Sequence, residues 1–166
     1  MVRALLDVLD SLVYSSVMND TARSAAPDTG ALAFGLLKVA EMIDQRLNSA
    51  LEPQRLSLAK FGVLQTLVDS GSPLPLGVLS ERLGCVKSNI TQLVDRLEAD
   101  DLVRRIADPQ DRRTKLAAIT EEGRRRHAQG RRALDGAQRE LLAGVSQDER
   151  ARLTELLLRL GAGDTG

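Results

Sequence analysis

The stretch that decides the fold is LSERLGCVKSNITQLVDRLEADDLVRRIADPQDRRTKLAAITEEG, residues 79–123. Pro75 and Gly84 bracket a short helix predicted over about 75–83, because proline suits the first turn of a helix and glycine suits its end. A second helix is predicted over about 87–100. Two helices joined by a tight turn that contains glycine are typical of a helix-turn-helix.

A β-hairpin is predicted directly after the second helix. Two runs of β-forming residues, 102–106 and 115–120, flank the charged, proline-containing segment 107–114. Thr120 is predicted to cap the next helix, with Glu121 and Glu122 in its first turn, where negative charge suits the helix dipole. The predicted fold is therefore mainly α, an α+β winged helix-turn-helix in which the hairpin is the wing.

The second helix has one apolar and one polar face. Ile90, Leu93, Val94 and Leu97 lie together when the sequence is wound with helical periodicity. The opposite side is rich in amides and hydroxyls, which reach phosphate oxygens and base edges alike. Solvation of an exposed helix is the alternative explanation, and Asp95 on this side would repel a phosphate. The residues predicted to contact DNA from this helix are Lys87, Ser88, Asn89, Thr91, Gln92 and Arg96.

The wing concentrates positive charge. Between residues 102 and 115 five cations stand against only Asp108 and Asp111, in a chain whose net charge is zero. A basic hairpin after a helix-turn-helix favours insertion into a DNA minor groove, whose negative potential attracts arginine. A solvated charged loop is the alternative. The cations predicted to contact DNA are Arg104, Arg105, Arg112, Arg113 and Lys115.

The stretch also resembles the MarR (multiple antibiotic resistance regulator) family of winged-helix transcription factors. The resemblance rests on LSERLG, ITQLVDRLE, DLVRR, DPQDRR and LAAITEEG, and it continues into residues 57–67 and 146–160. It implies a homodimer with intertwined terminal helices. It also implies a repressor or activator whose DNA affinity is tuned by small anionic or phenolic ligands.

The resemblance assigns roles to residues of the wing. Arg112 or Arg113 matches the wing arginine, and Asp111 resembles the carboxylate that orients it through a charge-assisted pair. The polar residues of the second helix match major-groove positions. The chain departs from the family at Asp101, where glycine is usual, and at Val86, where a Ser or Asp cap is common.

Apolar stripes predict further helices on both sides of this stretch, over 2–18, 31–51 and, after a capping box formed by Ser146 and Glu149, about 147–160. These stripes exceed what a monomer of this size can cover, so we expect a two-fold homodimer. The predicted domains are 1–52 (N-terminal helices), 53–120 (DNA-binding winged helix) and 121–166 (C-terminal dimerisation helices).

The composition excludes several classes of protein. A single cysteine, Cys85, and a single histidine, His127, exclude a disulfide framework and the usual zinc sites, and no cofactor or metal is expected. Cys85 is predicted to be a small buried apolar residue rather than a redox sensor. His127 is predicted to lie on the surface or in an interface. No nucleophile–base set or phosphate-binding loop is present in the sequence, so an enzyme is not expected.

The predicted function is that of a DNA-binding transcriptional regulator. No apolar run approaches the ~20 residues that span a bilayer, and Asp7 and Asp10 interrupt the apolar N-terminus, so we expect a cytoplasmic protein of a bacterium or archaeon. We expect a homodimer that binds a palindromic operator in double-stranded DNA and represses transcription under control of a small anionic or phenolic ligand. The alternative is a winged-helix module for protein interaction or dimerisation without specific DNA binding.

Overall fold

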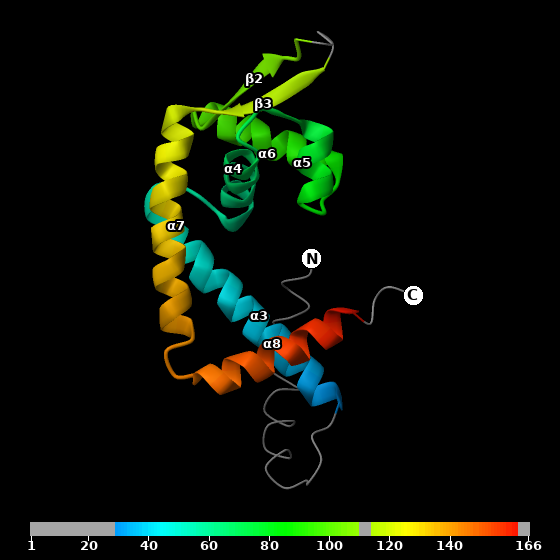
Figure 1. Cartoon of the computed structure of the whole chain (residues 1–166), viewed down its shortest axis with the longest axis vertical. Helices are drawn as coiled ribbons and strands as arrows, with labels where there is room; N and C mark the ends of the chain where they lie inside the picture. The colour runs from blue at the N-terminus through cyan, green and yellow to red at the C-terminus, as the bar shows by residue number, and fades with distance from the viewer. Residues whose placement is uncertain (1–28, 110–113, 163–166) are drawn as a thin grey trace, which may run out of the picture. The chain divides into compact units, whose positions relative to one another are not determined.

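The computed structural model describes residues 29–109 and 114–162. The chain divides into two compact units, Met1–Gln45 and Arg46–Gly166. The helix predicted over 2–18 lies outside the described residues. The elements in chain order are α3 (Thr29–Leu51), η2 (Glu52–Gln54), α4 (Leu58–Ser70), β1 (Leu74–Pro75), α5 (Leu76–Arg82), α6 (Lys87–Ala99), β2 (Val103–Ala107), β3 (Lys115–Ile119), α7 (Glu121–Leu141) and α8 (Gln147–Ala162) (Figure 1).

Local sequence signals set most helix boundaries in the second unit. The Ser57 side chain accepts the N–H of Lys60 at the start of α4, and the Thr120 side chain accepts the N–H of Gly123 at the start of α7. At α8, the Glu149 carboxylate accepts the N–H of Ser146, which completes the predicted capping box. The predicted cap at Thr120 and the predicted capping box at α8 are confirmed, and Ser57 adds a third cap.

The wing strands belong to a three-stranded antiparallel sheet of order β1-β3-β2. The predicted hairpin is confirmed, with Arg105 opposite Ala117 in the register of β2 and β3. Strand β1 was not predicted, because Pro75 was placed in the first turn of the following helix. In the structure Pro75 pairs with Leu116 and precedes α5 in an extended conformation, which the fixed φ of proline also permits.

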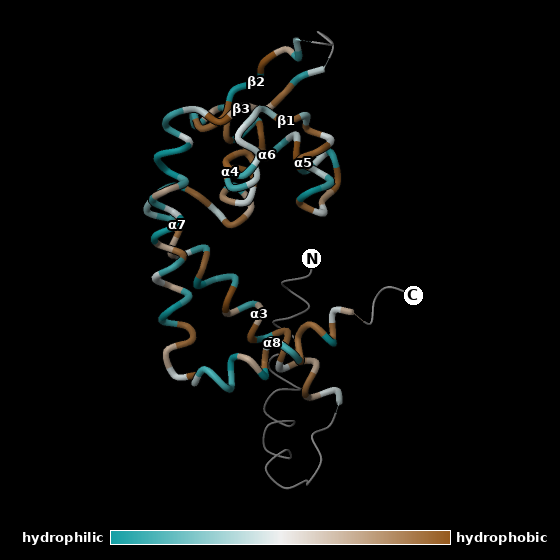
Figure 2. The backbone as a smooth tube through the Cα atoms, viewed as in Figure 1, coloured by the Kyte–Doolittle hydropathy of each residue, from teal (hydrophilic) through white to brown (hydrophobic). Residues whose placement is uncertain are grey.

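The core of the second unit lies where α4, α5 and α6 meet the sheet. Its completely buried side chains come from all these elements. In Figure 2, hydrophobic residues recur along α4, whereas the first half of α7 is mostly hydrophilic. Cys85 is half-buried and packs against this core, in agreement with the prediction of a small apolar residue. The largest buried residues are Leu51, Leu64, Leu67, Leu79, Ile90, Leu97 and Leu102.

Two tight turns position α6. Gly84 lies in the turn between α5 and α6 with φ 60°, and Asp101 adopts φ 58° between α6 and β2. Aspartate tolerates this left-handed conformation at some cost, which allows it to stand where the family resemblance expects glycine. Gly123 follows at the start of α7, where a Cβ atom would overlap the carbonyl oxygen of Leu102.

His127 is buried, which corrects the prediction of a surface or interface residue. Its ring stacks on Phe61, with centroids 5.0 Å apart, and its Nε2 lies 2.9 Å from Oε1 of Gln65. The three arginines that precede it are typical of a solvated segment. Helical spacing instead places His127 on the same side of α7 as the buried Gly130 and Leu134.

Apolar side chains remain exposed on the outer helices. In α8 no residue is buried, although the helix carries five exposed leucines: Leu153, Leu156, Leu157, Leu158 and Leu160. In the first unit, α3 exposes Leu32, Phe34, Leu36, Leu37, Val39 and Met42. None of the helices in 29–109 and 114–162 has the length and apolar character that crossing a membrane requires.

Candidate nucleic-acid interface

Helix α6 presents the face that the sequence predicted. Ile90, Val94 and Leu97 are buried in the core, and Leu93 is half-buried. All six predicted DNA contacts of this helix are exposed: Lys87, Ser88, Asn89, Thr91, Gln92 and Arg96. One of the hydroxyls is partly engaged, since Thr91 Oγ1 donates to the carbonyl oxygen of Lys87 at 3.1 Å.

The N-terminus of α6 has no side-chain cap. Val86 occupies the N-cap position in an extended conformation, and its carbonyl oxygen accepts the N–H groups of Asn89 and Ile90. The amides of the first turn therefore have no acceptor from a capping side chain. Free amides at a helix N-terminus suit a phosphate oxygen.

The cations at the base of the wing fall into two groups. Arg104 and Lys115 are exposed, and neither forms an ion pair within the described part of the chain. Arg105 is half-buried and turns back onto α6. Its guanidinium lies 2.6 Å from Asp95 and 2.6 Å from Glu98.

Asp95 and Glu98 are thus the anionic partners that fix Arg105. The Glu98 carboxylate accepts the Arg105 backbone N–H at 2.9 Å, and this bond together with the guanidinium lowers the pKa of Glu98 below its usual value. From its position on the polar side of the helix, Asp95 alone would repel a phosphate. The structure shows that its charge is directed at Arg105.

The tip of the wing, residues 110–113, lies outside the described residues. The predicted roles of Asp111, Arg112 and Arg113 therefore stay predictions.

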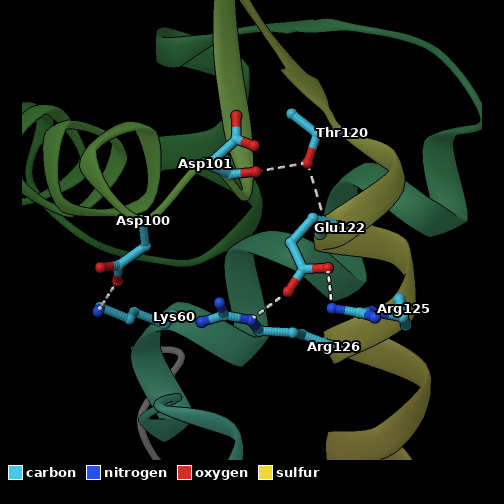
Figure 3. Close-up of polar contacts among 8 residues, drawn as sticks. Lys60, Asp100, Asp101, Thr120, Glu122, Arg125 and Arg126 are labelled. Carbon is cyan, nitrogen blue, oxygen red and sulfur yellow. Dashed lines mark hydrogen bonds and ion pairs between the residues drawn. The ribbon is translucent and has the colours of Figure 1, made fainter.

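The base of the wing is tied to the rest of the winged helix by polar contacts (Figure 3). Thr120 donates its hydroxyl to the carbonyl oxygen of Asp101 at 2.7 Å. On the other side of the same turn, Lys60 of α4 forms a 2.6 Å ion pair with Asp100 at the end of α6. Both contacts hold the segment that joins α6 to β2.

Two of the three arginines at the start of α7, Arg125 and Arg126, are paired within the protein. Figure 3 shows the Glu122 carboxylate between Arg125 and Arg126, to both of which it is bonded. The hydrogen bond from Arg126, with the charge of Arg125, lowers the pKa of Glu122. The spacing of three and four residues on one helix would have identified these pairs from the sequence.

These contacts leave one side of α6 and the exposed wing-base cations open to solvent. Amide and hydroxyl groups at its N-terminal half can bond to base edges, while Lys87, Arg96, Arg104 and Lys115 supply charge for phosphates. No group of three His, Cys, Asp or Glu side chains that could hold a metal ion occurs among the described residues. The arrangement has the chemical groups that binding to duplex DNA requires.

Comparison with known proteins identifies the family. Residues 56–115, from two residues before α4 to the first residue of β3, match the sequence model of the MarR family. The crystal structure of a MarR-family transcriptional regulator from Rhodococcus sp. RHA1 superposes with a TM-score of 0.68 at 29% identity, covering 82% of this chain and 97% of that one. CouR from Rhodococcus jostii RHA1, solved with p-coumaroyl-CoA, superposes with a TM-score of 0.67 at 31% identity, covering 82% and 95%. The chain belongs to the MarR family.

The curated relatives of this MarR-family chain are transcriptional regulators. The HTH-type transcriptional regulator MhqR of Bacillus subtilis (strain 168) is 35% identical over 81 residues, which make up 49% of this chain and 55% of MhqR. The chain spans 61% and 59% of the lengths of two further regulators from the same organism. The predicted family and winged-helix fold are confirmed.

Proposed function

We propose that this MarR-family protein is a homodimeric transcriptional regulator that binds a palindromic operator in double-stranded DNA and represses transcription. The observation that carries the proposal is the exposed polar face of α6 beside the exposed cations Arg104 and Lys115. Base edges in the major groove are read by amides and hydroxyls, and phosphates are held by cations. Such a regulator acts where the chromosome lies, so the proposal includes the cytoplasm of a bacterium or archaeon.

Duplex binding tested over a range of salt concentrations decides between this function and a protein-interaction module. Sequences enriched from a random duplex library should bind with a log affinity that falls linearly with log salt, because phosphate contacts release counterions. A protein-interaction module would enrich no sequence and would bind random duplex weakly. Fluorescence anisotropy with labelled duplexes measures both.

The proposed dimer rests on the exposed apolar residues of α8 and, separately, of α3. A helix such as α8 with five exposed leucines and no buried residue is typical of a subunit interface. We propose that the helices of 1–52 and 121–166 form the dimer and that 53–120 carries DNA binding. The interface should bury more than ~2,000 Å², as obligate dimers do. A monomeric mass by light scattering at micromolar concentration would contradict it.

A small anionic or phenolic effector completes the proposal. CouR was crystallised with p-coumaroyl-CoA, an anionic thioester of a phenolic acid. We expect p-coumaroyl-CoA or free p-coumarate to raise the thermal midpoint of this protein and to weaken its binding to the enriched duplex. If neither compound changes either quantity, this effector class is not supported.

A further inference from the structure

Val86 is an exposed apolar residue at the N-cap of α6, which we call the recognition helix because the proposed function places it in the major groove. Its side chain is 63% exposed, and no other large hydrophobic side chain is exposed among the described residues of 53–120. Its neighbours differ sharply from it: Cys85 before it packs against the core, and Lys87 and Ser88 after it are polar and exposed. Val86 is therefore an isolated, exposed apolar side chain at the edge of the polar face of α6.

This position is unfavourable for the free protein. Ser57, Thr120 and Ser146 cap the helices that follow them, whereas Val86 offers no side-chain acceptor. Replacing a polar cap by an aliphatic residue typically destabilises a helix. Exposure of the side chain also means that Val86 gains little from packing. Residues that lower the stability of a protein without a structural benefit occur mainly at functional sites.

We propose that Val86 contacts the 5-methyl group of a thymine in the major groove and so selects a T·A pair at one position of each half-site. The proposal rests on the proposed duplex-binding function. Among the groups that base pairs display in the major groove, the thymine methyl is the apolar one, and aliphatic side chains contact it. Valine suits this role because its branched side chain is stiff at χ1 and loses little freedom on contact.

The neighbouring residues favour a base over a phosphate or a protein as the partner of Val86. The valine methyls cannot donate to a phosphate oxygen, and they would displace its water. A protein partner would bring an apolar surface against Lys87, Ser88 and Asn89, all of which are exposed and polar. A base edge instead offers a methyl group beside hydrogen-bonding atoms, which matches an apolar residue followed by polar ones.

Substitution of thymine by deoxyuridine tests the contact, because the two bases differ only by the 5-methyl group. Each thymine in a duplex enriched by the wild-type protein is replaced in turn, and affinity is measured by anisotropy. One position per half-site should lose about fourfold in affinity, as expected for one buried methyl group. Val86→Ala should remove most of this difference, whereas Gln129→Ala, which alters an exposed residue of α7, should retain it.

Val86→Ser separates recognition from stability. Serine can cap α6, so the thermal midpoint should rise while the discrimination between thymine and deoxyuridine disappears. A wild-type protein that binds both bases equally at every position, or a Val86→Ala protein that discriminates as the wild type does, would overturn the inference and leave duplex binding intact. Failure of the wild-type protein to enrich any duplex would overturn the proposed function and this inference with it.

Discussion

Glu98 of α6 is bonded to Arg105 of β2 twice, through the Arg105 backbone N–H at 2.9 Å and through its guanidinium at 2.6 Å. Strand β2 lies at the edge of the sheet, so its outward N–H groups have no neighbouring strand. Glu98 supplies an acceptor at this edge, and Asp95 holds the other side of the guanidinium. The recognition helix and the wing are thereby joined by a charged network rather than by packing alone.

We expect Arg105→Ala to weaken duplex binding without changing its salt dependence, because the Arg105 guanidinium is paired with Asp95 and Glu98 and we expect it to position the wing rather than to hold a phosphate. The loss should be about fivefold, or roughly 1 kcal/mol, since the pair is only partly shielded from solvent. Arg104→Ala is the matched comparison, because it removes an exposed cation from the same strand. That variant should lower the slope of log affinity against log salt by about one phosphate equivalent.

The Glu98→Gln variant provides a second check on the same network. Glutamine can still accept the Arg105 N–H but carries no charge, so affinity should fall less than in Arg105→Ala. An equal decrease in salt slope for the Arg105→Ala and Arg104→Ala proteins would show that Arg105 contacts a phosphate.

Gln92 and Ser88 should differ in what they recognise. Gln92→Ala should change the preference among operator variants by about 1–3 kcal/mol at one base pair, as expected for the loss of a bidentate contact to adenine. Ser88→Ala should lower the affinity for all duplex sequences more evenly, since we expect a hydroxyl in the first turn of α6 to contact a phosphate. Competition binding with a panel of single-base variants measures both effects. An equal loss on every duplex for Gln92→Ala would assign base recognition to another residue.

The sequence was sufficient to predict the elements that depend on local signals. Caps such as Ser57 and Thr120, the turn at Gly84 and the buried face of α6 depend on residues near one another in the chain, where spacing determines contact. The sequence was insufficient where partners come from different elements. Strand β1 has two residues and exists only because β3 lies beside it.

The same reason explains why the partners of two single side chains were not predicted. Arg105 lies seven residues from Glu98, across a left-handed turn, so no helical or strand periodicity relates the two. His127 follows three arginines, and its burial depends on how α7 packs against Phe61 of α4. In both cases the tertiary partner, rather than the local sequence, decides whether a charged or polar side chain is free.

For Asp111 at the predicted wing tip, two explanations predict opposite changes in DNA affinity when the residue is replaced by alanine. Removal of a negative charge near DNA should strengthen binding if only electrostatics matter. If Asp111 instead orients Arg112 or Arg113 by a charge-assisted bond, Asp111→Ala should weaken binding. We expect weaker binding, together with a broad loss of affinity in Arg113→Ala. Tighter binding by Asp111→Ala at moderate salt would leave Asp111 as a solvated loop residue.

His127 should make the free energy of unfolding depend on pH near 6.5, where no other side chain of this chain ordinarily titrates. Burial against α4 lowers the pKa of His127 below its usual value of 6.5, and the charge of Arg131 lowers it further, while Asp69 opposes both. As pH falls through about 6.5, the unfolded chain takes up a proton that the folded protein does not. The free energy of unfolding should therefore decrease from neutral pH downward, until the folded pKa is passed.

The chain contains one histidine, so a single substitution isolates this effect. His127→Phe keeps an aromatic ring against Phe61 but removes the titrating group and the hydrogen bond to Gln65. Thermal midpoints measured between pH 7.5 and pH 5.5 — about one unit on either side of the ordinary histidine pKa — should fall with pH for the wild-type protein. The His127→Phe protein should be less sensitive over the same range, whatever its absolute stability. Parallel curves for the two proteins would show that His127 is not protonated preferentially in the unfolded state.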